Sequence, residues 1–201
     1  MGLALKDFAA ALGTIMIFGS AASAGNSAAV AGAPGAAREA KLSVLTSNWT
    51  PKEKVSFAKL SAAAAGFSDA RAENEIEQSG PDNAARTRAE KENQDQDFYV
   101  SLDTIEAKKT PKYTPAELRK ENTRMNQSFV KLMKAKDTAL WGTTTKNGII
   151  KAQKAWVAYR NAWLEFAKVR YPGQPADSID GWLTKKRNAM FDSLLGATAV
   201  E

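Results

Sequence analysis

Seven residues between Ile149 and Arg170 recur at intervals of three and four positions, and this spacing constrains the fold more than any other feature. They are Ile149, Ala152, Trp156, Tyr159, Trp163, Phe166 and Arg170. On an α-helix such residues lie along one face, and an apolar face of this kind usually packs inside a protein. Each buried aromatic side chain contributes on the order of 2–3 kcal/mol. The spacing therefore predicts a long helix that anchors a core.

Two almost identical start signals predict further helices. Thr50-Pro51-Lys52-Glu53 and Thr114-Pro115-Ala116-Glu117 each combine an N-cap threonine, a proline at the first helical position and a glutamate at the third. Ser79-Gly80-Pro81-Asp82 ends the first of these helices and starts another, which extends to about Ala107. The first half of that helix has few apolar residues, so we expect it to be solvated.

The remaining breaks complete the expected architecture. Thr143 to Thr145 can cap the helix that contains the seven-residue seam, and residues 171–175 separate it from a last helix over about 176–195. No segment has a convincing strand pattern. Helices joined by short breaks favour antiparallel packing, so we expect an all-α fold, an antiparallel bundle of about five helices without a sheet.

The amino terminus has the pattern of an export signal. Lys6 precedes an uncharged apolar run, and Ala22-Ser23-Ala24 supplies the small residues of a cleavage site. We expect residues 1–24 to be a signal peptide cleaved after Ala24, residues 25–48 to be a flexible Ala/Gly/Ser-rich linker and residues 49–201 to form one helical domain. The protein would then be periplasmic or secreted, without an integral membrane span after signal removal.

The chain has no histidine and no cysteine. Catalysis by a Ser-His or Cys-His arrangement, thiolate metal sites and haem attachment are therefore excluded. We expect no cofactor, no metal site and no catalytic residue. The alternative is a carboxylate-based hydrolase or a divalent-cation site, for which Asp69, Glu73 and Glu77 share a helical face. Glu92, Asp95 and Asp97 form a second acidic cluster.

Charge is unevenly distributed along the sequence. Residues 69–106 contain 11 acidic and 4 basic residues, a net charge of −7, whereas residues 107–201 contain 18 basic and 8 acidic residues, a net charge of +10. This asymmetry indicates either pairing between the two parts or a bipolar surface offered to a partner. Nucleic acid is not an expected partner of an exported chain that lacks a groove of basic and aromatic residues.

Three stretches carry a family resemblance. Residues 153–161, QKAWVAYRN, resemble the Q-R-A-W-x-x-Y-R-D signature of the LprI-type family, small exported helical domains described as N-terminal domains of lysozyme inhibitors. Met125-Asn126 with Phe129 and Leu132 is similar to the family's M-N-x-x-[YF]-x-x-L helix, and Leu183-Thr184 with Arg187 to its closing L-T-x-x-R helix. The match covers about residues 118–195. Members often carry cysteines beside these motifs, and this chain has none.

The resemblance implies a non-enzymatic inhibitor of a lysozyme or another cell-wall hydrolase. Its binding residues would be the polar members of the motifs, Asn126, Tyr159, Arg160, Thr184 and Arg187. The alternative for these residues is pairing within the domain, with Asn126 capping a backbone group and the two arginines bridging helices.

A second function stays open from the charge alone. An envelope protein could bind peptidoglycan, anionic lipid or a protein through a basic face. Its residues would be Lys108, Lys109, Lys112, Arg119, Lys120, Arg124, Lys131 and Lys134.

Overall fold

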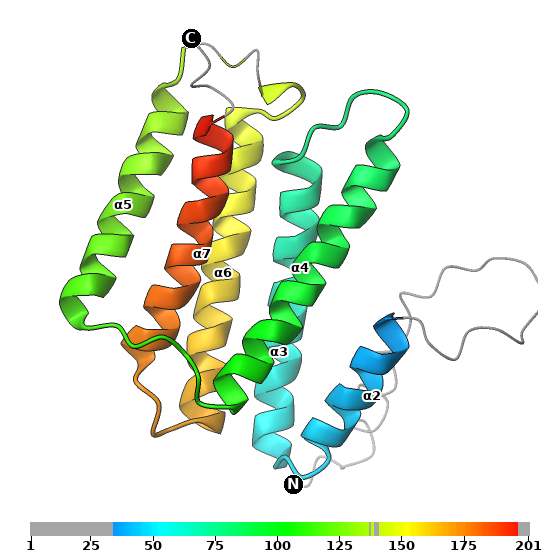
Figure 1. Cartoon of the computed structure of the whole chain (residues 1–201), viewed down its shortest axis with the longest axis vertical. Helices are drawn as coiled ribbons and strands as arrows, with labels where there is room; N and C mark the ends of the chain where they lie inside the picture. The colour runs from blue at the N-terminus through cyan, green and yellow to red at the C-terminus, as the bar shows by residue number, and fades with distance from the viewer. Residues whose placement is uncertain (1–33, 137, 139–140, 197–201) are drawn as a thin grey trace, which may run out of the picture. The chain divides into compact units, whose positions relative to one another are not determined.

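The computed structural model describes residues 34–136, 138 and 141–196, and no residue in these ranges belongs to a β-strand. The all-α prediction is therefore confirmed, with six described helices in place of about five (Figure 1). They are α2 (Pro34–Thr46), α3 (Pro51–Asn74), α4 (Asn83–Glu106), α5 (Pro115–Lys134), α6 (Lys146–Arg170) and α7 (Ala176–Gly196).

Helix α2 occupies thirteen residues of the segment that the composition predicted to be a flexible linker. Proline at its first position and Ala, Glu, Lys and Leu along its length all favour a helix, which explains the difference. The chain divides between Lys41 and Leu42 into two units, which are described separately. In the second unit, Leu42 and Leu45 pack against the core. The expected signal peptide lies outside the described residues.

The predicted helix starts are confirmed at three places. Thr50 donates its backbone N–H to Glu53 Oε2 at 2.7 Å, and Glu53 N–H donates to Thr50 Oγ1 at 3.3 Å, which is a complete capping box. Thr114 and Glu117 form the same reciprocal pair at the start of α5. Thr145 Oγ1 accepts the N–H of Gly148 at 3.0 Å at the start of α6.

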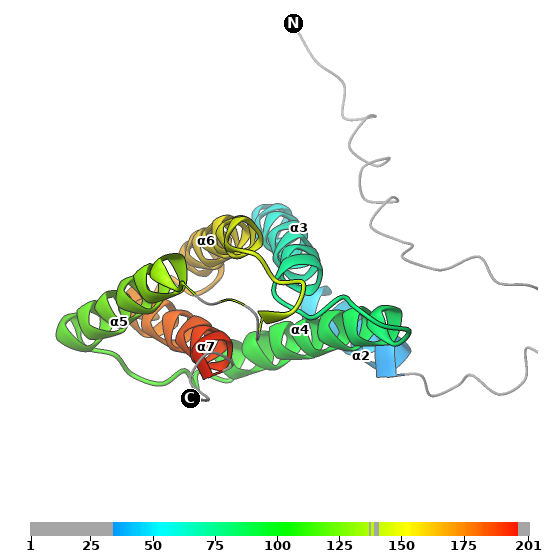
Figure 2. The same cartoon turned by 90° about the horizontal axis from the view of Figure 1, so that it is seen from above.

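The helices pack mainly as two pairs, α3 with α6 and α5 with α7, while α4 packs beside α3 (Figures 1 and 2). Pairs of contacting residues give the directions. Glu53 at the start of α3 meets Arg170 at the end of α6, so these helices are antiparallel. Arg124 contacts Asp192, and Tyr113, just before α5, contacts Ser178 near the start of α7, so α5 and α7 run parallel.

The seam of α6 lies in the core, as predicted. Its six non-charged members are at most 6 % exposed. The ring of Trp163 lies 5.7 Å from that of Phe98 of α4, and the ring of Tyr159 stacks on Phe67 of α3 at 5.6 Å between centroids. The α6 helix therefore joins α3 and α4 through aromatic contacts, which are worth about 0.5–1.5 kcal/mol beyond the area they bury.

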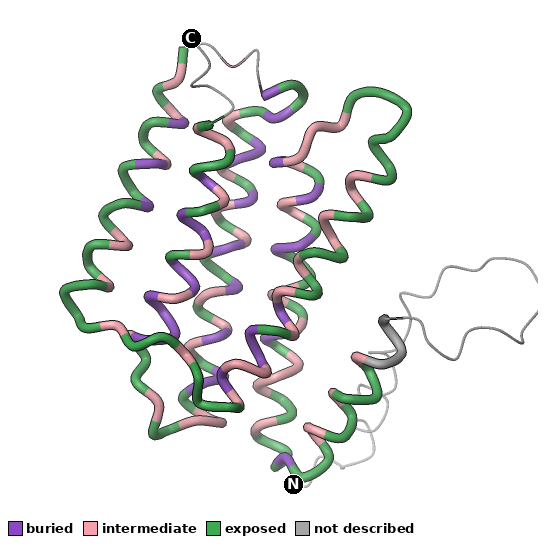
Figure 3. The backbone as a smooth tube through the Cα atoms, in the orientation of Figure 1, coloured by how far each residue is buried: buried purple, intermediate pink, exposed green. Residues whose placement is uncertain are grey.

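Helix α4 is anchored at one end only. Its buried residues are Phe98, Ser101, Leu102 and Ile105, all in its carboxyl-terminal part. The residues of its first half are exposed or half-buried (Figure 3), as predicted. That half is held to α3 by ion pairs, Glu90 with Arg71 at 2.5 Å and Lys91 with Asp69 at 2.6 Å.

We expect the amides of residues 83–96 to exchange hydrogen faster than those of residues 98–105. Few buried apolar contacts hold the first half, and its ion pairs weaken when salt screens them. Native-state hydrogen exchange at low and high salt measures this, with the amides of α6 as the control. Equal protection along the whole of α4, unaffected by salt, would contradict the expectation.

Candidate functional site

The five residues expected to bind a partner are not gathered on one surface. Arg187 and Thr184 are completely buried, and Tyr159 is 6 % exposed. Arg160 is half-buried, and Asn126 alone is exposed. Burial raises the pKa of the Tyr159 hydroxyl well above its usual range, so this side chain is neutral at ordinary pH. Four of the five therefore belong to the interior or its edge.

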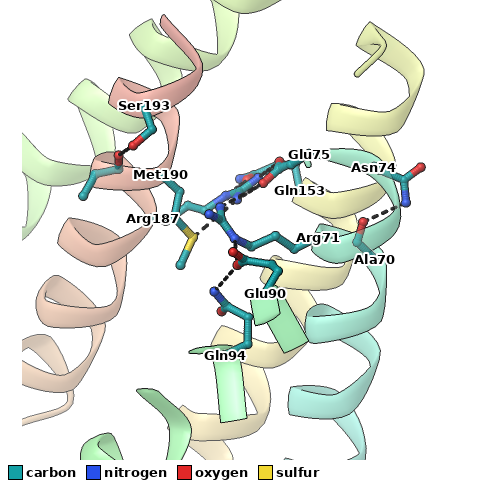
Figure 4. Close-up of polar contacts among 11 residues, drawn as sticks. Ala70, Arg71, Asn74, Glu75, Glu90, Gln94, Gln153, Arg187, Met190 and Ser193 are labelled. Atoms are coloured by element: carbon teal, nitrogen blue, oxygen red, sulfur yellow. Dashed lines mark hydrogen bonds and ion pairs between the residues drawn. The ribbon is translucent and has the colours of Figure 1, made fainter. Parts of the chain in front are cut away.

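Arg187 lies at the centre of a buried ion pair (Figure 4). Its Nη1 and Nη2 atoms donate to Glu75 Oε2 at 2.8 Å and to Glu75 Oε1 at 2.5 Å. Its Nε donates to Gln153 Oε1 at 2.9 Å, and its guanidinium lies 4.3 Å from the centroid of the Phe191 ring. Both charged side chains are completely inaccessible. Such a pair requires this dense set of contacts to offset its desolvation.

The network extends beyond this pair. Glu75 also accepts a hydrogen bond from Arg71 at 3.2 Å, and Arg71 pairs in turn with Glu90. Gln94 donates to the same oxygen of Glu90 at 2.7 Å. Side chains from α3, α4, α6 and α7 are thus joined in one continuous set of contacts (Figure 4). In this set Arg187 holds helices together.

Arg160 of α6 forms an ion pair with Asp180 of α7. Its Nε and Nη2 atoms donate to the two carboxylate oxygens of Asp180, the bidentate geometry that arginine favours. Thr184 donates to the same carboxylate at 3.3 Å, and the Arg160 guanidinium lies 5.8 Å from the Trp156 ring centroid. The expected bridging of helices by Arg160 and Arg187 is therefore confirmed.

The acidic residues expected for a carboxylate site are engaged separately. Asp69 pairs with Lys91, whereas Asp97 accepts from Lys186 at 2.6 Å. Glu77 accepts backbone N–H groups, and Glu73 is exposed. Within the described ranges, no group of three or more acidic residues is placed to hold a metal ion.

Glu77 fixes the connection before α6. Its carboxylate accepts the N–H of Ser79 and the N–H of Thr143, each at 2.7 Å, and these bonds hold its pKa at about 2. Gly142 adopts a left-handed φ of +59°, and a Cβ there would lie 1.2 Å from Glu77 Oε2. The glycine is therefore required both by its backbone conformation and by the close approach of this carboxylate.

We expect the Glu77→Gln variant to be less stable than the parent at neutral pH and to lose less stability in acid. The pKa of Glu77 is lowered in the folded chain. Its contribution to the free energy of unfolding is therefore present above pH 4.5 and is lost as the pH falls toward about 2. Urea unfolding of both proteins across that interval measures the difference. Parallel pH profiles would show that the Glu77 carboxylate contributes nothing.

Ion pairs join the acidic and basic parts of the sequence, one of the two arrangements that the charge asymmetry predicted. Glu75 pairs with Arg187, and Asp97 pairs with Lys186. Glu106 accepts from Arg170 at 3.2 Å. The charge of α7 and of the end of α6 is therefore partly neutralised inside the molecule.

The outer side of α5 is not neutralised in this way. All eight residues expected in a basic face are exposed. Five of them lie on α5, namely Arg119, Lys120, Arg124, Lys131 and Lys134. Of the five, only Arg124 makes an ion pair within the described part of the chain, with Asp192 at 2.7 Å.

The sequence of α5 explains why this side is so basic. The helix has two acidic residues, Glu117 and Glu121. Glu117 belongs to the capping box, and Glu121 accepts a hydrogen bond from Asn188 of α7 at 2.7 Å. Lys120, Arg124, Gln127, Lys131 and Lys134 follow a 4-3-4-3 spacing, and we call this set the basic stripe. The sequence analysis identified the cations but not their regular spacing, although that spacing is visible in the sequence itself.

A shallow open hollow follows the second half of the basic stripe. Its described lining residues are Thr123, Asn126, Gln127, Val130, Lys131, Lys134 and Ala135. Asn126, the exposed member of the expected site, thus lies beside the stripe. The hollow offers hydroxyl and amide groups next to two ammonium groups.

None of the described helices has the length and apolar character needed to cross a membrane. No protein-family model, characterised protein sequence or solved structure matches the chain. Its function is therefore inferred from the geometry of its own residues.

Proposed function

We propose that the protein is an exported binding protein without enzymatic activity, which attaches to an anionic component of the cell envelope through the basic stripe of α5. The single observation that carries the proposal is the excess of cations on one exposed helix side. Lys120, Lys131 and Lys134 have no ion-pair partner in the described residues. Cations that are left unpaired on one side of a helix raise the local concentration of anionic partners.

The position of α5 supports the same proposal. The helix packs on α7 and buries Met125, Ser128 and Leu132, while its opposite side stays exposed (Figure 3). The basic residues on the other helices are more often engaged, as Arg170, Lys186 and Arg187 are. Fewer internal acidic residues therefore compete with an anionic partner for the cations of α5 than for those of the other helices.

Inhibition of a lysozyme or another cell-wall hydrolase, the function that the family resemblance implies, has weaker support. Four of its five expected binding residues are buried or half-buried, and the two arginines are paired with acids of this chain. The purified protein added to lysozyme and amidase assays is expected to give no saturable inhibition. Saturable inhibition that survives neutralisation of the basic stripe would overturn our proposal in favour of this alternative.

The proposal is tested by co-sedimentation of the purified protein with isolated envelope fragments and with vesicles that contain anionic lipid. The stripe variant carries Lys120→Gln, Arg124→Gln, Lys131→Gln and Lys134→Gln. A matched variant removes the same charge from exposed positions on α3 and α6, with Lys52→Gln, Lys59→Gln, Lys151→Gln and Lys154→Gln.

We expect the parent and the matched variant to sediment with at least one anionic material at low salt, and the stripe variant to stay in solution. Binding should weaken as salt rises, because exposed charges are screened over about 8–10 Å at physiological ionic strength. Equal loss in both variants would mean that net charge alone acts. If the parent sediments with neither material, the proposal is overturned.

A further inference from the structure

We infer that the partner is a linear phosphate-bearing polymer that lies lengthwise along the basic stripe from Lys120 to Lys134. This inference rests on the proposed function, since it specifies the anion that the same surface would bind. The juxtaposition that carries it is a straight row of four cations and one amide on one helix side, beside the shallow hollow.

The shape of the stripe favours an extended partner. At 3.6 residues per turn, its five members lie within about a quarter of the helix circumference. At a rise of 1.5 Å per residue, they extend over about 21 Å. A compact anion would contact one end of this row, either Lys120 with Arg124 or Lys131 with Lys134. A chain of repeating anionic units contacts both ends at once, and the second contact then forms at a high effective concentration.

The residue types are compatible with phosphate. The planar fork of arginine matches carboxylate and phosphate alike, and lysine is a common phosphate ligand that acts as a point charge. Three of the four cations of the stripe are lysines, and the guanidinium of Arg124 already donates to the carboxylate of Asp192 at 2.7 Å. The free positive charge is therefore mainly that of ammonium groups.

The centre of the stripe is polar without charge. Gln127 lies between the two pairs of cations, and Thr123 and Asn126 line the hollow next to it. Amide and hydroxyl groups donate hydrogen bonds to phosphate oxygens and to hydroxyl groups of a repeating unit. A polymer with phosphates and hydroxyl groups thus finds a complementary group at each position along the row.

A bilayer surface fits this side of α5 less well. A helix that binds at a membrane interface buries an apolar face beside its charges. The apolar face of α5 is already covered by α7, where Phe129 packs on Phe191 at 6.0 Å between ring centroids. On the exposed side the large apolar residue is Val130, at 46 % exposure. A protein partner would in turn be expected to meet aromatic residues at the centre of an interface, and the stripe has none.

The test is calorimetric titration of the full chain with linear polyphosphate. Two lengths are compared at the same concentration of phosphate units. The first is a polyphosphate long enough to span about 21 Å, and the second is triphosphate. Polyglutamate of similar length and vesicles with anionic lipid are the comparison probes. The stripe variant and the matched variant described above are measured in parallel, and circular dichroism checks that each is folded.

We expect the long polyphosphate to bind at least about tenfold more tightly than triphosphate, because several contacts form together. The stripe variant should lose at least about tenfold in affinity, and the matched variant should lose much less. Binding of vesicles without binding of polyphosphate would overturn this inference and leave the proposed function standing. Equal affinity for polyglutamate would overturn the choice of phosphate. Absence of binding to all of these probes would overturn this inference, and the proposed function would fall with it only if the parent also fails to sediment with envelope fragments.

Discussion

The Arg187→Ala variant is expected to be less stable than the parent by about 3–5 kcal/mol, because it leaves the carboxylate of Glu75 buried without its closest partner. Both side chains are completely inaccessible, so water cannot replace the lost contacts. Arg71 still reaches Glu75 at 3.2 Å, which places the expected loss toward the lower end of this range. Urea or thermal unfolding monitored by circular dichroism measures the change.

Two comparison variants separate the buried pair from ordinary surface pairs. Arg124→Ala removes the partner of Asp192, and both side chains of that pair are about half exposed. We expect this change to cost at most about 1 kcal/mol. Replacing Arg187 and Glu75 together by apolar residues of similar volume should restore much of the stability lost in Arg187→Ala. If Arg187→Ala lowers the free energy of unfolding no more than Arg124→Ala does, the buried network contributes no more to stability than an exposed ion pair.

The same comparison bears on function. If Arg187 acts only by holding helices together, the Arg187→Ala protein that remains folded at low temperature should bind anionic partners as the parent does. The basic stripe lies on α5, and Arg187 donates to groups of α3 and α6. Loss of binding in a folded Arg187→Ala protein would instead show that the buried network also supports the binding surface.

The local signals in the sequence predicted the local structure well. The capping boxes at Thr50 and Thr114 fix helix starts through contacts between residues three positions apart, and such contacts can be read directly. The seam of α6 is likewise a property of one helix. The exposed cations of α5 were predicted from its composition, because charged residues are mostly exposed in folded proteins.

The contacts between distant residues could not be predicted in the same way. Arg187 and Glu75 are separated by 112 positions, and their meeting depends on how four helices are arranged around them. The motifs indicated that Arg187 and Arg160 matter, but spacing does not distinguish an arginine that faces a partner from one that bridges helices. The parallel packing of α5 on α7 likewise depends on tertiary contacts, such as that of Tyr113 with Ser178.

Replacing Trp163 by alanine is expected to cost about 3–5 kcal/mol, because it removes the largest ring at the junction of α6 with α4. Trp163 is completely buried, and its ring lies 6.0 Å from that of Phe166 and 5.7 Å from that of Phe98. The void would open at the end of α4 that contains all of its buried residues. The loss in free energy of unfolding should therefore exceed that caused by truncating a side chain with few buried neighbours.

The Trp163→Ala variant should also change hydrogen exchange in a local pattern. Amides of residues 98–105 should lose protection more than those of α5, because α4 depends on this aromatic contact and its first half contains none of its buried residues. Val157→Ala, on the exposed side of the same helix at 38 % exposure, should change stability by about 0.5 kcal/mol or less. If Trp163→Ala lowers protection uniformly across the helices, α4 unfolds together with the rest of the core. The aromatic contact then stabilises the whole bundle and does not act as a separate anchor for α4.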